Sequence, residues 1–110
     1  MDMLDLLDLI CTGHLFSQPN LSFLLKTMIS TSTGLNKLKA GIPYNHLLAH
    51  KTGQAGRAED GSRIADNDAG IVYLPNKERS YIIVFIKDSR ESDETNAGII
   101  ADVARLFFVK

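Results

Sequence analysis

The sequence places a lysine, a threonine and a glycine together at the end of an apolar run. Lys51, Thr52 and Gly53 follow Leu47-Leu48-Ala49-His50, whose residue types favour a β-strand. An ammonium and a hydroxyl at a strand end can bind a carboxylate, and a glycine lets a ligand approach the backbone closely. The next backbone amide, that of Gln54, can donate to an oxyanion along the same strand edge. Lys51, Thr52, Gly53 and Gln54 are therefore the candidate binding residues.

The other polar side chains predict no second catalytic site and no metal site. His50 adjoins Lys51, but neighbouring side chains of a strand point to opposite faces, so a packed structural histidine is favoured over a general base. His14 and His46 have no spaced Cys, Asp or Glu partners. We expect no metal and no other cofactor.

Two acidic clusters are interpreted as structural. Asp66-Asn67-Asp68 lacks the glycine and the distal glutamate of a calcium loop, so a strand-entry cap or turn is expected there. Glu91, Asp93 and Glu94 lie where a helix begins and are expected to form a solvated cap rather than a catalytic pair. Cys11 lies in an apolar helical stretch and is expected to be a buried small hydrophobe.

The first part of the chain is predicted to be helical. Apolar residues at three- and four-residue spacing indicate an amphipathic helix over residues 2–12, closed by Gly13. Ser17 caps a second helix, which ends near Thr31. Residues 35–40 leave room for little more than one further helical turn.

Three strands and a closing helix are predicted to follow. Branched and aromatic residues indicate strands at 46–54, 70–74 and 81–87. A turn at residues 75–78 makes the last two strands an antiparallel hairpin, and the polar link 55–68 is expected to be a mobile or ligand-facing loop. Ser92 caps the closing helix, which runs to about Val109 and packs on the sheet. The predicted fold class is α+β, with a three-stranded antiparallel sheet between helices.

The composition argues against several classes of function. The 110 residues are 45% hydrophobic and 23% charged, with a net charge of -1. Such a chain can bury a core as one unit, and without a basic excess it is not expected to bind nucleic acid. Its longest apolar runs are far shorter than the roughly 20 residues that a membrane span needs. The acidic start Met1-Asp2-Met3-Leu4-Asp5 does not resemble a signal peptide.

Four stretches together resemble one known family. They are Asn36-Lys37-Leu38-Lys39-Ala40-Gly41-Ile42-Pro43, Ala49-His50-Lys51-Thr52-Gly53, Asp66-Asn67-Asp68-Ala69-Gly70-Ile71-Val72-Tyr73-Leu74-Pro75 and Val84-Phe85-Ile86-Lys87-Asp88-Ser89. This series closely resembles the C-terminal part of class A serine β-lactamases, and especially the branch common in Bacteroides-type bacteria. The helix, link and helix of residues 6–34 also resemble the segment that precedes the lysine strand in those enzymes.

The resemblance implies a β-lactamase/transpeptidase-like fold. Residues 1–34 would belong to the end of the family's all-helical region, and residues 35–110 to its α/β region. Residues 51–54 would form the wall of a substrate pocket: Lys51 as an electrostatic element, Thr52 bonding the substrate carboxylate, and Gln54 lending its backbone amide to the oxyanion hole. Many members also hold the carboxylate with an arginine, for which Arg57 and Arg63 are both open candidates.

The family's reaction requires motifs that are absent from the sequence. Hydrolysis of the β-lactam amide through a serine acyl-enzyme uses Ser-x-x-Lys, Ser-Asp-Asn and a deacylating glutamate, and none of these motifs occurs here. We expect no catalytic residue in this chain and no activity of the chain alone. The resemblance implies an intact parent that acts on β-lactams in the periplasm or outside the cell.

The same comparison predicts partners. The missing N-terminal part of the fold is the expected partner, and the open edges of the three-stranded sheet make self-association possible. Two other readings stay open. The chain could belong to a penicillin-binding or transpeptidase-like protein, or it could be a non-catalytic module that uses the edge at residues 51–54 for binding.

Overall fold

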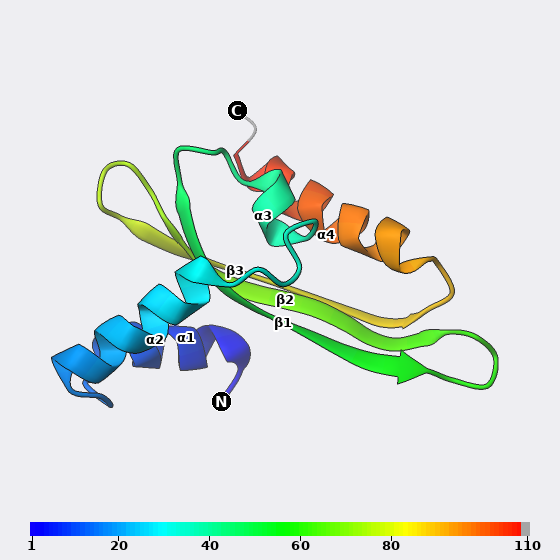
Figure 1. The fold of residues 1–110 in the computed structure, drawn as a ribbon, viewed down its shortest axis with the longest axis horizontal. Helices are drawn as coiled ribbons and strands as arrows, with labels where there is room; N and C mark the ends of the chain where they lie inside the picture. The colour runs from blue at the N-terminus through cyan, green and yellow to red at the C-terminus, as the bar shows by residue number, and fades with distance from the viewer. Residues whose placement is uncertain (109–110) are drawn as a thin grey trace.

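The computed structural model describes residues 1–108, which form helices on both faces of one sheet (Figure 1). The elements are α1 Met3–Thr12, α2 Gln18–Ser30, α3 Leu38–Gly41, β1 Leu47–Arg57, β2 Arg63–Tyr73, β3 Arg79–Ser89 and α4 Asp93–Phe107. The three strands pair antiparallel in the order β1-β2-β3. Helices α1 and α2 cover one face of the sheet, and α3 and α4 cover the other. The predicted α+β class is confirmed, and Val109 lies outside the described residues.

The helices begin and end where local capping chemistry places them. The hydroxyl of Ser17 accepts from the backbone of Asn20 at the start of α2. Ser92 caps α4 in the same way, and the backbone amide of Gly13 closes α1 by donating to the carbonyl of Leu9. The sequence-based prediction of these three helices is confirmed. Helix α3 is a single short turn, also as predicted.

The first two strands are longer than the sequence indicated. β1 and β2 stay paired out to Arg57 opposite Arg63, so the predicted loop over residues 55–68 is wrong except for residues 58–62. This turn is closed by a hydrogen bond from the backbone amide of Ala58 to the carbonyl of Ser62, and Gly61 adopts a left-handed φ of 85°. The turn between β2 and β3 is confirmed at the predicted place, where the amide of Leu74 donates to the carbonyl of Glu78.

Alternation along the strands divides the core into two layers. On the α3–α4 side, Leu48 and Val72 pack with Ile100 of α4. On the α1–α2 side, Ala49 and Ile71 pack with Leu7 of α1. Because successive side chains of a strand point to opposite faces, Lys51 belongs to the same face as Ala49, whereas Thr52 belongs to the same face as Leu48. The candidate lysine and threonine therefore lie on different sides of the sheet.

The side chain of Cys11 is less buried than the sequence predicted. Cys11 is only partly buried, at the margin of the α1–α2 layer.

Among residues 1–108, no helix is long and apolar enough to cross a membrane. No three His, Cys, Asp or Glu side chains of the described part of the chain gather closely enough to hold a metal ion.

Candidate functional site

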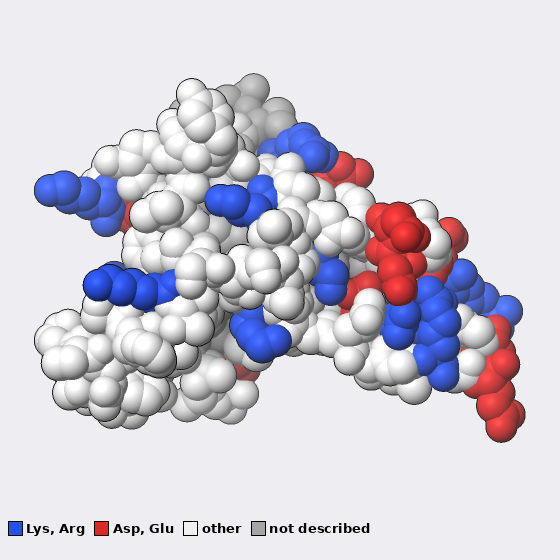
Figure 2. Space-filling view, viewed as in Figure 1, with Lys and Arg blue, Asp and Glu red and all other residues white. Residues whose placement is uncertain are grey.

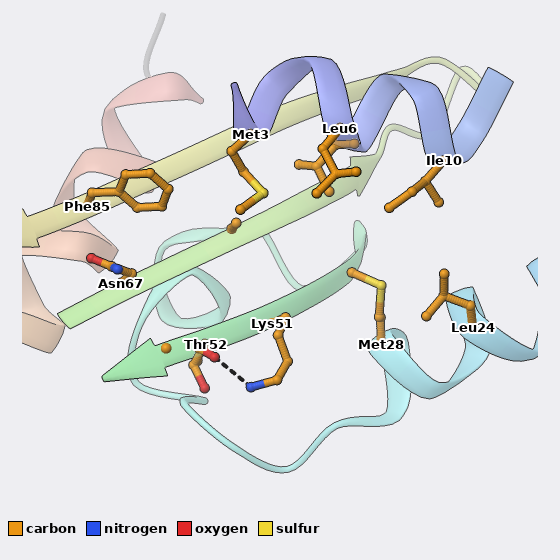
Figure 3. Close-up of a pocket in the computed structure, with 12 residues that line it drawn as sticks. Met3, Leu6, Ile10, Leu24, Met28, Lys51, Thr52, Asn67 and Phe85 are labelled. Carbon is orange, nitrogen blue, oxygen red and sulfur yellow. Dashed lines mark hydrogen bonds between the residues drawn. The ribbon is translucent and has the colours of Figure 1, made fainter. Parts of the chain in front are cut away.

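Lys51 lies on β1, an edge strand of the sheet, with its side chain exposed. Its ammonium donates a hydrogen bond of 2.6 Å to the carbonyl of the neighbouring Thr52 (Figure 3). Within residues 1–108, no carboxylate forms an ion pair with this ammonium. The positive charge of Lys51 is therefore available for an anionic ligand.

The segment between α2 and α3 packs closely against the side chain of Thr52. Gly34 in this link has a φ of 62°, and a Cβ added there would lie 2.3 Å from Cγ2 of Thr52. Glycine is required at position 34 for two reasons, because the left-handed backbone disfavours other residues and because Thr52 occupies the space of a side chain. The close approach restricts the Thr52 side chain.

Gly53 and Gln54 complete the candidate residues along the exposed edge. Apart from Gly53 itself and its two chain neighbours, no atom of residues 1–108 lies within 4 Å of the position that a Cβ of Gly53 would occupy, so the β1 backbone can be approached there. The side-chain amide of Gln54 donates to Asp66 Oδ2 at 3.4 Å, across to β2. The four predicted residues thus share one accessible stretch of strand.

Two hollows meet at Lys51. One, of about 400 Å³, is apolar and lies between the sheet and helices α1 and α2 (Figure 3). The other, of about 460 Å³, is lined by Lys51, His50, Met28 and five hydroxyl side chains: Thr27, Ser30, Thr31, Ser32 and Thr33. We did not select these hydroxyl groups from the sequence as site residues, although five of the seven residues 27–33 are Ser or Thr. A cation beside several hydroxyl groups suits a carboxylate or another anion.

A buried polar network supports the strand directly beneath the candidate site. His50 Nδ1 lies 3.0 Å from Asp68 Oδ1, and the backbone amide of Leu38 donates to Asp68 Oδ2 at 3.2 Å. His50 is only 2% exposed, and Gly70 opposite it leaves no room for a side chain of its own. The prediction of a packed structural histidine is confirmed.

The neighbouring aspartate of β2 forms a second buried contact. Asp66 Oδ1 lies 2.6 Å from the ammonium of Lys37, and the aspartate side chain is 0% exposed. The expectation that Asp66-Asn67-Asp68 forms a strand-entry cap or turn is wrong, because these residues lie inside β2. Asp66 and Asp68 instead tie the start of α3 and the link before it to the sheet. Asn67 points to the other face and contributes to the apolar hollow.

Arg57 and Arg63 do not converge on Lys51. Both guanidinium groups contact the carboxylate of Asp93, Arg57 at 2.9 Å and Arg63 at 2.7 Å. Arg57 lies six residues from Lys51 along an extended strand, a span of about 20 Å. Neither arginine therefore helps the Lys51 ammonium to hold a carboxylate in this structure.

Asp93 was predicted to belong to a solvated cap, but its carboxylate also forms ion pairs with Arg57 and Arg63. The hydrogen bonds from Arg63, with further help from Arg57, lower the pKa of this carboxyl below its ordinary value. Figure 2 shows basic and acidic side chains interleaved at this end of the molecule, where the β1–β2 hairpin meets the start of α4. The contact fastens the far end of the hairpin to the helix.

Known proteins match both the sequence and the fold of this chain. A profile described as the β-lactamase enzyme family matches residues 1–109. The chain belongs to this family. A class A β-lactamase from Bacteroides cellulosilyticus DSM 14838 has a similar structure, with a TM-score of 0.89 and 42% identity over 94% of the chain. The predicted resemblance to class A β-lactamases is therefore confirmed.

Curated relatives show how much of a class A β-lactamase the chain represents. It is 49% identical over 96 residues to a β-lactamase of Bacteroides uniformis, a match that covers 86% of the chain and 32% of that protein. It is 41% identical over 94 residues to β-lactamase VEB-1 of Pseudomonas aeruginosa, covering 31% of that protein. The chain thus spans about a third of the length of these relatives and corresponds to a fragment of the class A fold.

Proposed function

We propose that this chain supplies the substrate-holding wall of a class A β-lactamase active site. The observation that carries the proposal is Lys51, which has no carboxylate partner within residues 1–108 and lies between two hollows on an accessible strand edge. Although the side chains of Lys51 and Thr52 leave β1 toward different faces, the Lys51 ammonium reaches back to the Thr52 carbonyl at the strand edge, so in the proposed role both residues bind the carboxylate of a β-lactam there. The backbone amide of Gln54 donates to the oxyanion that forms when the lactam carbonyl is attacked.

The parent reaction in this proposal is hydrolysis of the β-lactam amide through a serine acyl-enzyme, in the periplasm or outside the cell. The chain alone lacks the motifs for the nucleophile and the general base, so it is proposed to bind without turnover. Loss of the nucleophile in a comparable serine hydrolase lowers kcat by about a million-fold. The β-lactamase names of the relatives favour this role over a transpeptidase-like one.

Binding is tested by titrating the purified chain with benzylpenicillin while following its backbone amides by NMR. We expect saturable shifts at residues 51–54 and in the hydroxyl-rich segment 27–33. Lys51→Ala should abolish these shifts, because it removes the cation that meets the carboxylate. Lys87→Ala is the matched control, since Lys87 is an exposed lysine on β3.

Turnover is tested separately with a chromogenic cephalosporin and a fluorescent penicillin. We expect neither hydrolysis nor covalent labelling of the chain. Covalent labelling would contradict the absence of a nucleophile, and shifts that persist unchanged in Lys51→Ala would contradict the role of Lys51. Shifts without turnover are also what a purely binding module would give, so reconstitution with the rest of the fold distinguishes the two.

A further inference from the structure

A second lysine lies close to the candidate binding residues, at the start of α3. The side chain of Lys37 is only 10% exposed, and its Cδ lies 3.4 Å from the point that a Cβ of Gly34 would occupy. Cγ2 of Thr52 lies even closer to the same point. The two side chains therefore flank Gly34 together, and a largely buried cationic side chain lies beside Thr52.

This second cation is paired with a buried carboxylate. The Lys37 ammonium lies 2.6 Å from Oδ1 of Asp66, whose side chain is 0% exposed. Oδ2 of the same carboxylate accepts from the side-chain amide of Gln54 at 3.4 Å, and Gln54 is also the direct partner of Asp66 in the β1–β2 pairing. One carboxylate thus joins the lysine beside Thr52 to the residue that carries the proposed oxyanion-binding amide.

The pair affects how much positive charge a ligand at this edge of β1 meets. A carboxylate bound at Thr52 is attracted by the Lys37 ammonium and repelled by Asp66. Because the two charged groups are in direct contact, their effects on the ligand largely cancel. Both are buried, so solvent and salt screen them little, and the loss of either charge would leave the other one uncancelled.

We propose that Asp66 is a specificity-determining residue, because it neutralises the Lys37 ammonium beside the place where a carboxylate binds. The inference rests on the proposed function, since it concerns the same ligand at the same edge. It makes Lys51, which forms no ion pair within residues 1–108, the cation on which recognition of the carboxylate depends. The preference of the edge for a carboxylate over an uncharged ligand is correspondingly smaller than two free cations would give.

A purely structural role of the pair predicts a different result. If Lys37 and Asp66 only fastened the start of α3 to the sheet, removing either charge would loosen β1 and weaken ligand binding in both cases. The electrostatic role predicts effects of opposite sign, because one substitution leaves a positive charge and the other leaves a negative charge. The signs of the two effects therefore distinguish the two roles.

The test is to measure the dissociation constant of benzylpenicillin by NMR for the unsubstituted chain, Asp66→Asn, Lys37→Met and the double variant. We expect Asp66→Asn to bind about fivefold more tightly and Lys37→Met about fivefold more weakly. The double variant should bind within about twofold of the unsubstituted chain, because both charges are gone. Circular dichroism checks that each variant is folded.

Two controls isolate the charge effect. Benzylpenicillin methyl ester lacks the negative charge, so its affinity should change by less than about twofold among the four chains. Asp102→Asn removes a carboxylate that is 72% exposed and pairs with Arg105 on α4, so it should leave the affinity for benzylpenicillin unchanged.

A measurement on the unsubstituted chain decides the case in which a variant does not fold. The side-chain Cε and Hε signals of the lysines are followed during the titration with benzylpenicillin. We expect the signals of Lys51 to shift as the ligand binds, whereas those of Lys37 should stay nearly constant, because its ammonium remains with Asp66. Lys37 signals that shift as far as those of Lys51 would overturn the inference.

The outcomes separate this inference from the proposed function. Opposite effects of Asp66→Asn and Lys37→Met support the inference. Tighter binding by Asp66→Asn also supports it when the unsubstituted chain shows no saturable binding, in which case the proposed function fails. Weaker binding by both single variants, or unchanged affinities, overturns the inference and leaves the proposed function standing. The absence of binding by every one of the chains overturns both.

Discussion

His50 of β1 and Asp68 of β2 form a buried pair next to the candidate lysine. His50 Nδ1 lies 3.0 Å from Oδ1 and 3.1 Å from Oδ2 of the aspartate, and the two side chains are 2% and 0% exposed. The same carboxylate accepts from the backbone amide of Leu38. One side chain therefore joins β1, β2 and the start of α3, beside the residues proposed to hold a substrate.

Removing this carboxylate should destabilise the fold. Asp68→Ala leaves the His50 ring and the Leu38 amide buried without their partner, so we expect the free energy of unfolding to fall by about 3 kcal/mol. Urea denaturation measures the change. Asp102→Ala is the matched control, because Asp102 is 72% exposed and its ion pair with Arg105 should contribute less than about 1 kcal/mol. Equal effects of the two substitutions would contradict this role of Asp68.

Two glycines should respond to alanine in opposite directions. Gly34→Ala places a side chain on a left-handed backbone and against Thr52, so we expect a loss of about 1–3 kcal/mol in unfolding free energy. Gly98→Ala, within α4, meets no atom within 4 Å and should stabilise the chain by about 0.5–1 kcal/mol. Chemical denaturation of both variants tests the contrast. If the Gly34→Ala variant were as stable as the unsubstituted chain, the segment between α2 and α3 would not constrain Thr52.

Asp93 should make the chain sensitive to acid. Hydrogen bonds from Arg63 lower the pKa of Asp93 in the folded state, so its contribution to stability is present above about pH 4, the ordinary aspartate range. That contribution is lost as the pH falls through the lower folded-state pKa. Asp93→Asn should therefore lower the melting temperature at pH 6. The difference in melting temperature between this variant and the unsubstituted chain should become smaller toward pH 2. Glu94→Gln, also in the first turn of α4, is the matched control at pH 6, because the two arginines pair with Asp93 and not with Glu94.

Ionisation of two tyrosines should lower the stability of the fold at alkaline pH. Burial raises the pKa of Tyr73 and of Tyr81, and the Tyr81 hydroxyl also donates to Asp8 at 2.9 Å. Because the folded pKa values lie above the ordinary value of about 10, their stabilising contribution is complete below about pH 10 and is lost as the pH rises through the folded values. Thermal unfolding between pH 8 and pH 11.5 should show the loss.

Phenylalanine variants identify the groups responsible for that loss. Tyr73→Phe and Tyr81→Phe should each make stability less dependent on pH above about 10, since the ionising hydroxyl is removed. Tyr44→Phe is the control for the loss of a tyrosine hydroxyl at neutral pH, because Tyr44 is 97% exposed. A constant melting temperature of the unsubstituted chain between pH 8 and pH 11.5 would contradict this role of Tyr73 and Tyr81.

The sequence by itself determined the features that depend on local chemistry. The cap residues Ser17 and Ser92 and the closing Gly13 place three helix ends within a residue or two, because each satisfies backbone groups of its own helix. The turn at residues 75–78 was also predicted, since it depends on residues adjacent in the chain. The family resemblance was readable as well, because the stretch with Lys51-Thr52-Gly53 and three others between residues 36 and 89 carry it together.

Only the tertiary structure decided how far β1 and β2 extend and what their polar residues do. The stretch Asp66-Asn67-Asp68 has low β-propensity, yet it lies in mid-sheet because Lys37 and His50 pair with its aspartates. From the sequence, Arg57 and Arg63 were both candidates for binding a ligand. In the structure both bind Asp93, which lies 30 or more residues away in the chain. Propensities describe a residue and its neighbours in sequence, whereas the energies that placed these charges come from partners that only folding brings together.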